Sequence, residues 1–349
     1  MNWQDRIGRV VVRVQRRLPR RLLNRRFGPP PTIDGYTLDH HVHAYQATLT
    51  AAQNRNAPTE ITVDAIRDGF RRMVAVGSSS PVASVSVHDR TIPGPAGELP
   101  IRLYHPRRTT GRADAIVWFH QGGGVIGDLD TDHTLCTRLA DAADALVVSV
   151  DYRLAPEHPF PSDVVDAAAA YQWVVDHAEG LGIDGQRVAV AGTSQGGKLA
   201  AVVSQQRRRE GLRPPLAQVL LYPGLDASWT GGSLDSMAEA WPLGAATLTF
   251  FGSSAEVDES RILDPGASPG RESNLAGLPP AVIVTAGFDP LRDQGNDYAE
   301  RLAAAGVKVV HRCETRLPHS FTLMGAASSE AERATREIAG DVARLLASI

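Results

Sequence analysis

The sequence predicts an α/β protein with a mostly parallel central sheet covered by helices on both faces. Short apolar runs such as 115–119 and 145–150 have the length and composition of buried strands. Helical patterns alternate with such runs along most of the chain, and this alternation is typical of parallel sheets. The length of 349 residues and the hydrophobic content of 43% suffice for one large domain with insertions.

The first 27 residues differ in charge from the rest of the chain. They hold nine arginines and one acidic residue, Asp5, and therefore carry +8, whereas the whole chain carries −3 and the remainder −11. The apolar side chains follow helical spacing and fall on one face, while most arginines fall on the other. The apolar set is Trp3, Ile7, Val10, Val11, Val14 and Leu18, and the cationic set is Arg6, Arg9, Arg13, Arg16, Arg17 and Arg20.

Two interpretations of this segment stay open. A cationic amphipathic helix suits an anionic membrane surface. Alternatively, the segment is an arm that packs its apolar face on the protein's own body and leaves its arginines in water. Arginines break up every candidate apolar core of a signal peptide, and no run approaches the length of a transmembrane helix. We expect a cytoplasmic protein, with peripheral membrane contact through residues 1–27 as the open alternative.

A linker and two helices are expected next. Gly28 and the three prolines after it are typical of a linker. Residues 36–76 predict two helices separated near 54–58, so residues 1–80 form a basic arm and a helical cap. The cluster of His40, His41 and His43 lacks the cysteine or acidic partners that a metal centre needs. We expect surface histidines and no metal.

The catalytic part of the fold is expected over residues 81–349. Strands at 85–92 and 99–104 form a hairpin around the turn 94–97. Ser162 is expected to cap one helix, and Ser329 with Glu332 to form a capping box for the last. The segment 225–262 interrupts the alternation and is expected to be a second cap segment at the carboxyl edge of the sheet, where ligands bind in such folds. Buried strands are expected at 115–119, 145–150, 188–191, 219–222, 281–285 and 307–313, and helices at 132–143, 162–174, 198–209, 292–305 and 329–349.

A nucleophile motif follows the strand at 188–191. Residues 192–196 read G-T-S-Q-G, which fits G-x-S-x-G between a strand and a helix. Glycines at Gly192 and Gly196 permit a turn too tight for a Cβ, and this turn presents the hydroxyl of Ser194 at a helix N-terminus. The alternative is an ordinary glycine-rich turn.

An acid and a histidine follow the serine in the order that a catalytic triad of this kind requires. Asp289 lies just past a strand, and His319 lies in a loop after the last strand. A serine hydroxyl needs a base, and the base needs an orienting acid. A helix cap or a loop histidine would explain either residue alone, but the two together, in this order, favour a triad with Ser194.

A glycine-rich loop, His120 to Asp128, directly follows the strand at 115–119. Acyl transfer needs backbone N–H donors near the developing oxyanion, and glycines allow that close approach. A phosphate-binding loop is disfavoured, because neither a Walker lysine nor G-x-G-x-x-G spacing is present.

These motifs resemble the hormone-sensitive lipase-like branch of the α/β-hydrolases. The resemblance covers about residues 82–349 and rests on the H-x-G-G block at 120, D-Y-R-L-A-P-E-H-P-F-P at 151, the elbow at 192 in its G-T-S variant, and D-P-L-R-D at 289 with His319. It implies the α/β-hydrolase fold with a helical cap, and a triad of Ser194, Asp289 and His319. It also implies that the N–H groups of Gly122, Gly123 and Gln195 bind the oxyanion, and that no cofactor is used.

Three positions depart from the family pattern. Gln121 replaces the first glycine of the H-G-G-G block, Gln195 replaces a small alanine, and Gly124 replaces an aromatic residue. We expect Gln121 and Gly124 to shape the substrate pocket.

The sequence therefore predicts a serine carboxylesterase that acts through an acyl-enzyme. An amidase or a lipid-ester hydrolase with the same triad is the alternative, and a non-catalytic binding protein on this fold is a further one. The expected partner is a small-molecule ester or lipid ester. No global charge suggests nucleic acid, and a homodimer stays open. Two cysteines in a chain of this length do not form a disulfide framework.

Overall fold

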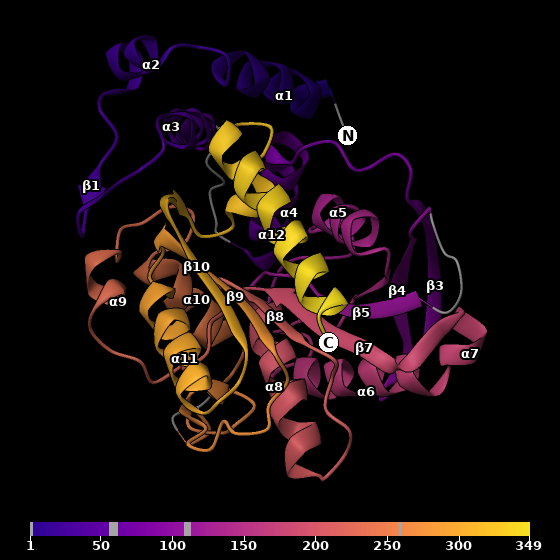
Figure 1. Cartoon of the computed structure of the whole chain (residues 1–349). Helices are drawn as coiled ribbons and strands as arrows, with labels where there is room; N and C mark the ends of the chain where they lie inside the picture. Colours follow the sequence, from indigo (N-terminus) through magenta and orange to yellow (C-terminus); the bar gives the residue numbers. More distant parts are fainter. Residues whose placement is uncertain (1–2, 56–61, 108–112, 258–259) are drawn as a thin grey trace.

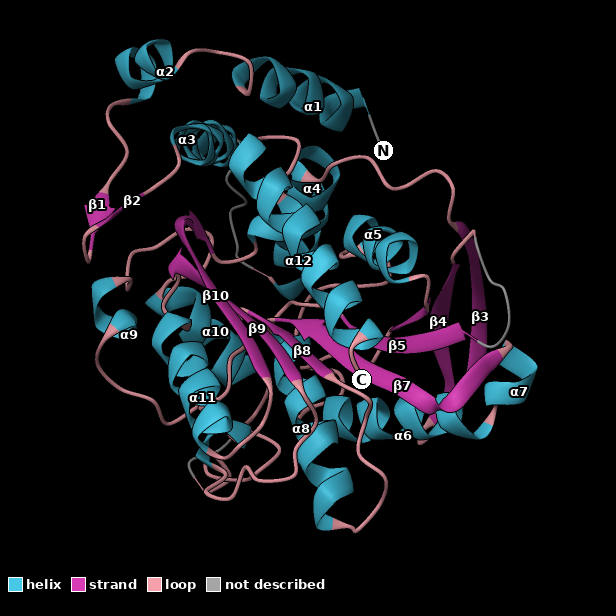
Figure 2. Cartoon of the chain, viewed as in Figure 1, coloured by secondary structure: helices cyan, strands magenta, loops and turns pink. Residues whose placement is uncertain are grey.

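The computed structural model describes residues 3–55, 62–107, 113–257 and 260–349. Across these residues the chain forms an eight-stranded sheet in the order β10-β9-β8-β7-β5-β6-β4-β3 (Figure 2). The pairs β3–β4 and β4–β6 are antiparallel, and the other neighbours are parallel. The mostly parallel sheet is confirmed. Its strands are β3 (Ser86–Gly94), β4 (Gly97–His105), β5 (Ala113–Phe119), β6 (Leu146–Val150), β7 (Ile183–Thr193), β8 (Gln218–Leu221), β9 (Ala281–Phe288) and β10 (Val309–Pro318).

Helices cover both faces of the sheet, as predicted (Figure 1). The larger helices of the catalytic part are α5 (His133–Ala143), α6 (Ser162–Asp176), α8 (Gln195–Arg209), α11 (Arg292–Ala304) and α12 (Ser329–Ala347). The N-terminal part contributes α1 (Trp3–Gln15), α2 (Arg20–Phe27), α3 (His40–Arg55) and α4 (Val63–Gly77). Shorter elements are β1 (Thr32–Ile33), β2 (Tyr36–Thr37), α7 (Ala178–Leu181), α9 (Ser233–Ser236), α10 (Ala245–Ser254), and the 3₁₀ turns η1 (Pro269–Arg271) and η2 (Phe321–Leu323).

Alternation along the strands divides the core into two layers. In β5, Ile116 and Trp118 belong to the layer beneath α5 and α12, while Val117 and Phe119 belong to the layer beneath α6, α8 and α11. Successive strand residues point to opposite faces, and both faces are apolar because both are covered. The carboxyl ends of the parallel strands therefore stand at one edge, which is where β5, β7, β9 and β10 deliver their loops.

Two predicted helix caps are wrong. The hydroxyl of Ser162 makes no capping hydrogen bond, and Pro161 occupies the cap position of α6. Ser328, not Ser329, caps α12 by accepting from the N–H groups of Glu330 and Ala331. The acid meant for that capping box, Glu332, is instead held by other partners, Arg138 and Ser79. The carboxylate of Glu332 therefore binds residues from other parts of the fold and does not cap the N-terminus of its own helix.

Two segments far apart in the sequence meet over the loop after β5. The first half of α4 and the aromatic side of α10 pack against Val125, Ile126 and Ala155. Arg67 of α4 donates to the carbonyl oxygens of Val125 (2.9 Å) and Ala155 (3.1 Å) and pairs with Glu157 at 2.6 Å. The hydrogen bond from Arg67 to the carboxylate lowers the pKa of Glu157 to about 2. Segment 63–77 thus lies beside segment 225–262 at the carboxyl edge of the sheet.

The N-terminal helix lies on the outside of the molecule, at the end shared with α2, α3 and α4 (Figure 1). Its inner side is made by Val12, which is 1% exposed, and by Gly8, which lies against Val76. Two of its arginines also turn inward: Arg9 donates to the carbonyl oxygen of Ser78, and Arg16 to that of Gly325. Of the two open interpretations, packing of the apolar face on the protein's own body is contradicted, because most of the apolar side chains of that face are exposed.

Candidate active site

The serine of the G-x-S-x-G motif lies at the turn between β7 and α8. Ser194 has φ 53° and ψ −115°, a conformation that non-glycine residues rarely adopt. A Cβ on Gly196 would lie 1.9 Å from the carbonyl oxygen of Phe119, and one on Gly192 would lie 2.6 Å from the same atom. The two glycines are therefore required by the approach of β5, as the sequence predicted. The strained turn lifts the serine hydroxyl above the sheet edge.

The three predicted triad residues are brought together by hydrogen bonds. Nε2 of His319 lies 2.9 Å from Oγ of Ser194, and Nδ1 of His319 lies 2.7 Å from Oδ2 of Asp289. The other carboxylate oxygen of Asp289 accepts from the N–H of Leu291, which fixes its orientation. The serine, histidine and aspartate are 8%, 4% and 0% exposed, so these bonds are shielded from bulk water. This arrangement can move a proton from the hydroxyl to the imidazole.

The aromatic ring of Tyr222 supports the histidine from one side. The two rings meet edge to face with centroids 4.9 Å apart, and the Tyr222 hydroxyl hydrogen-bonds Thr322 at 2.5 Å. Tyr222 is fully buried and follows β8. The sequence offered no signal for this role beyond its position just after a strand.

The glycine loop after β5 lies beside the serine. A Cβ on Gly122 would lie 1.9 Å from the carbonyl oxygen of Ile126, and one on Gly123 would lie 2.4 Å from the Phe251 ring. Both have positive φ, so only glycine is unstrained there. Among the described residues, none accepts a hydrogen bond from the N–H of Gly122, Gly123 or Gln195. These donors are free to bind a negative oxygen.

A buried carboxylate links the loop, the elbow and the histidine. Asp132 accepts from Nε1 of Trp118, from Nε2 of Gln121 at 3.0 Å and from the hydroxyl of Thr193 at 2.6 Å. Gln121 in turn accepts from the hydroxyl of Ser320, next to the triad histidine. Burial raises the pKa of the Asp132 carboxyl, while its hydrogen bonds oppose the rise. Gln121, a departure from the family pattern, and Thr193, which belongs to the G-T-S variant of the elbow, thus share one partner.

The prediction that Gln121 shapes the substrate pocket is wrong for its side chain. It is 1% exposed and points to Asp132 and Ser320 instead of the pocket. Gly124 does line the pocket. A Cβ there would make ordinary contacts, 3.5 Å from Nε2 of Gln195, yet the φ of +75° would strain any side chain by about 1 kcal/mol.

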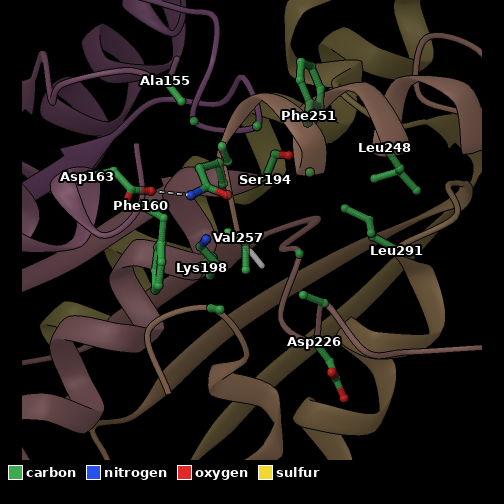
Figure 3. Close-up of a pocket in the computed structure, with 18 of the residues that line it drawn as sticks. Ala155, Phe160, Asp163, Ser194, Lys198, Asp226, Leu248, Phe251, Val257 and Leu291 are labelled. Carbon is green, nitrogen blue, oxygen red and sulfur yellow. Dashed lines mark hydrogen bonds between the residues drawn. The ribbon is translucent and has the colours of Figure 1, made fainter. Parts of the chain in front are cut away.

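A pocket of about 400 Å³ opens beside Ser194 (Figure 3). Its apolar wall comes largely from the segment 225–262, with Leu243, Leu248 and Phe251, together with Leu291. Its polar wall comes from α6 and α8. There Nε2 of Gln195 donates to Oδ2 of Asp163 at 2.6 Å, and Lys198 lies one helical turn after the serine. Sequence reasoning missed Asp163 and Lys198, although Lys198 follows Ser194 at i+4 on the same helix face.

Comparisons with known proteins show the family to which this chain belongs. A family model described as the alpha/beta hydrolase fold matches residues 116–323. The chain is 43% identical to "Esterase LipI" of Mycobacterium tuberculosis over 270 residues, which cover 76% of this chain and 84% of that protein. It is 40% identical to "Carboxylic ester hydrolase LipN" of the same organism, with coverage of 83% and 78%.

Solved structures agree as well. An ester hydrolase from the metagenome of Lake Arreo superposes with a TM-score of 0.84 at 34% identity, covering 88% of this chain and 99% of that one. The thermostable carboxylesterase EstE1, cloned from a metagenomic library, superposes with a TM-score of 0.77 at 35% identity, with coverage of 82% and 98%. Both are ester hydrolases by name.

Proposed function

Because this chain belongs to the hormone-sensitive lipase-like family of α/β-hydrolases and is a carboxylic ester hydrolase, we propose that Ser194, His319 and Asp289 are its catalytic triad. The hydrogen-bonded chain from Oγ through the imidazole to the carboxylate is the observation that carries this proposal. His319 takes the serine proton as Oγ attacks the ester carbonyl, and Asp289 holds the tautomer that leaves Nε2 unprotonated.

The oxyanion of the tetrahedral intermediate is bound by backbone donors. We assign this role to the N–H groups of Gly122, Gly123 and Gln195, supported by the lack of any other acceptor for them among the described residues. Gln195 is the first residue of α8, so the helix dipole adds to its donor. The protonated histidine then gives its proton to the leaving alcohol, and water deacylates the enzyme with the same histidine as base.

The helices α4 and α10 form the cap over this site. Phe251 of α10 lies against Gly123, and Arg67 of α4 donates to the carbonyl oxygen of Val125 in the glycine loop and to that of Ala155 in the loop after β6. The cap shapes the acyl pocket and limits bulk water around the developing charge, while a single water still enters to deacylate the enzyme. No cofactor is needed for this chemistry.

Ester preference over amide preference is tested with matched substrates. The enzyme is expected to cleave p-nitrophenyl esters of short and medium acyl chains with kcat/KM at least about a hundredfold above the p-nitroanilides of the same acids, since the poorer amine leaving group raises the barrier. Equal values of kcat/KM for the ester and its anilide would contradict the carboxylesterase assignment and favour an amidase.

The outward face of α1 supports a second proposal, that the enzyme works at an anionic lipid surface. Its outward apolar side chains are 40–69% exposed, namely Trp3, Ile7, Val10, Val11 and Val14. Exposed arginines flank them on one side, at Arg6, Arg13 and Arg17. An apolar stripe with cationic neighbours is what binds at the interface of an anionic bilayer. No helix in the described ranges is both long and apolar enough to cross a membrane.

Vesicle binding tests this proposal. The protein is expected to co-sediment with vesicles containing phosphatidylglycerol, to bind phosphatidylcholine vesicles more weakly, and to be released as salt is raised to about 0.5 M, because exposed charge attraction is screened. Replacing Ile7, Val10 and Val14 by serine should abolish sedimentation while leaving Tm unchanged, since all three side chains are exposed.

The matched control replaces Arg6, Arg13 and Arg17 by glutamine. It is expected to lose the preference for anionic lipid and keep weak apolar binding. A serine variant that still sediments fully would contradict the lipid-surface proposal. So would a wild-type dimer that this variant converts to a monomer, because the apolar face would then belong to a second copy of the chain.

We propose that the enzyme is located in the cytoplasm. The free thiols of Cys136 and Cys313 support a reducing compartment.

A further inference from the structure

A buried lysine in the wall of the pocket has no counter-ion in contact with it. Lys198 is 9% exposed and lines the pocket that contains Ser194 (Figure 3). Within the described ranges of the chain, no side chain or carbonyl oxygen forms a hydrogen bond or a contact ion pair with its Nζ. Nζ lies over the face of the Phe160 ring, 5.8 Å from the ring centroid.

The nearby carboxylate is already occupied by other donors. Oδ2 of Asp163 accepts from Nε2 of Gln195 at 2.6 Å, and Oδ1 accepts from the N–H of Val164 at 2.9 Å. Asp163 acts on the ammonium only through space, and burial outweighs this attraction so that the pKa of Lys198 is lowered. Burying an ammonium whose three N–H donors lack acceptors costs free energy, unless a bound ligand supplies an acceptor.

The position of the ammonium relative to the nucleophile defines which acceptor can reach it. Lys198 follows Ser194 by one turn of α8, and its N–H bonds the carbonyl oxygen of Ser194 at 3.0 Å. The Cα atoms of Ser194 and Lys198 are separated by about 6 Å along the helix axis, and both side chains line the same pocket, so the span to be bridged is on the scale of about four methylenes. The opposite wall of the pocket is apolar, with Leu243, Leu248 and Phe251. An ester held there would direct one end of a short apolar chain at the lysine.

We propose that Lys198 binds a carboxylate carried by the substrate, so that the enzyme prefers esters bearing an acidic group about four methylenes from the scissile carbonyl. This inference rests on the esterase chemistry at Ser194 and names its substrate class. Among the residues that the structure describes, the titratable groups lining the pocket are Lys198, Asp163, His158 and Asp226. Asp163 opposes the incoming carboxylate by charge, and its bond to Gln195 turns its oxygens away from a direct contact with Lys198.

Matched pairs of anionic and neutral substrates test the proposal. For an acid on the acyl side the pair is the mono-p-nitrophenyl ester of adipic acid and its carboxamide isostere, with the enzyme-free rate subtracted. For an acid on the alcohol side the pair is γ-acetoxybutyrate and γ-acetoxybutyramide, followed by acetate release. The measured quantity is the ratio of kcat/KM for the anionic to the neutral member of each pair, which reports differential transition-state binding.

Two variants should move this ratio in opposite directions. Lys198→Met keeps the length of the side chain and removes the charge, and is expected to lower the ratio by about ten- to a hundredfold in at least one pair. Asp163→Asn keeps the shape and removes the charge. With the N–H of Val164 holding the side-chain oxygen, the new NH₂ faces Gln195, whose amide turns over to accept from it. This variant is expected to raise the ratio in the same pair. Lys198→Arg keeps the cation and should retain most of the preference.

The result separates this inference from the proposed mechanism. If Lys198→Met leaves both ratios within about twofold of wild type, the carboxylate site is overturned even though neutral esters are still cleaved. A fall of both ratios in Lys198→Met and in Asp163→Asn alike also overturns it, because it would indicate a general disturbance of the pocket. Loss of the triad chemistry would instead appear as failure to cleave both members of each pair.

Discussion

Ser194→Ala is expected to lower kcat by roughly four to six orders of magnitude while leaving the fold intact. The reason is geometric. Oγ of Ser194 makes the hydrogen bond to the imidazole, at 2.9 Å, and alanine keeps the backbone N–H that donates to the carbonyl oxygen of Leu221. Initial rates on a p-nitrophenyl ester and a circular-dichroism melting curve measure the two quantities.

The residual activity of this variant is informative. The oxyanion donors and the pocket stay in place, so a small rate above the uncatalysed reaction is expected. A folded Ser194→Ala protein with near-wild-type esterase activity would remove Ser194 from the mechanism. An organophosphonate is expected to label wild-type protein at Oγ of Ser194 and not to label the Ser194→Ala variant, because the nucleophilic oxygen is missing.

Asp289→Asn is expected to lower kcat by on the order of 10³–10⁴ near neutral pH. Its carboxylate accepts from Nδ1 of His319 at 2.7 Å and from the N–H of Leu291 at 2.8 Å. With Leu291 holding one side-chain atom, an amide NH₂ facing Nδ1 favours the tautomer that leaves Nε2 protonated. The histidine could then no longer take the proton of Ser194.

Asp293→Asn is the matched control, since it lies on the same motif and is also an aspartate beside the site. Its oxygens accept from Nε of Arg292 and from the N–H of Ser233, so it ties α11 to the segment that carries α9. We expect a loss within about tenfold in kcat, together with a lower Tm. Equal losses from both variants, or a greater loss at Asp293, would mean that the other carboxylate orients the histidine.

Much of the site could be predicted because its signals are local. The run 188–191 is apolar enough to be a strand. Gly192 and Gly196 indicate a turn in which neighbouring backbone comes too close for any Cβ. The order of Ser194, Asp289 and His319 is a property of the chain itself. Each follows a strand whose carboxyl end stands at the same edge, so parallel topology brings them together.

Errors arose where a side chain had competing partners. Glu332 matched a capping box, but Arg138 and Ser79 bind it from other elements. Gln121 lay in the oxyanion loop and was expected at the pocket, yet Asp132, eleven residues later, takes its amide. A polar group buried without a partner is costly, so the side chain turns to whichever partner the fold supplies. Sequence spacing does not show which partner that is.

By itself, the sequence determined the alternation of strands and helices that makes a mostly parallel sheet, the sharp turn at Ser194, and the amphipathic pattern of residues 3–15. Only the tertiary structure decided which way that pattern faces, because a helical wheel describes the sides of a helix and not what lies against them. Val12, Arg9 and Arg16 bind the body, so the apolar stripe points to solvent. The polar wall of the pocket was decided in the same way: Asp163 and Lys198 belong to α6 and α8, and only the packing of these two helices places both beside one serine.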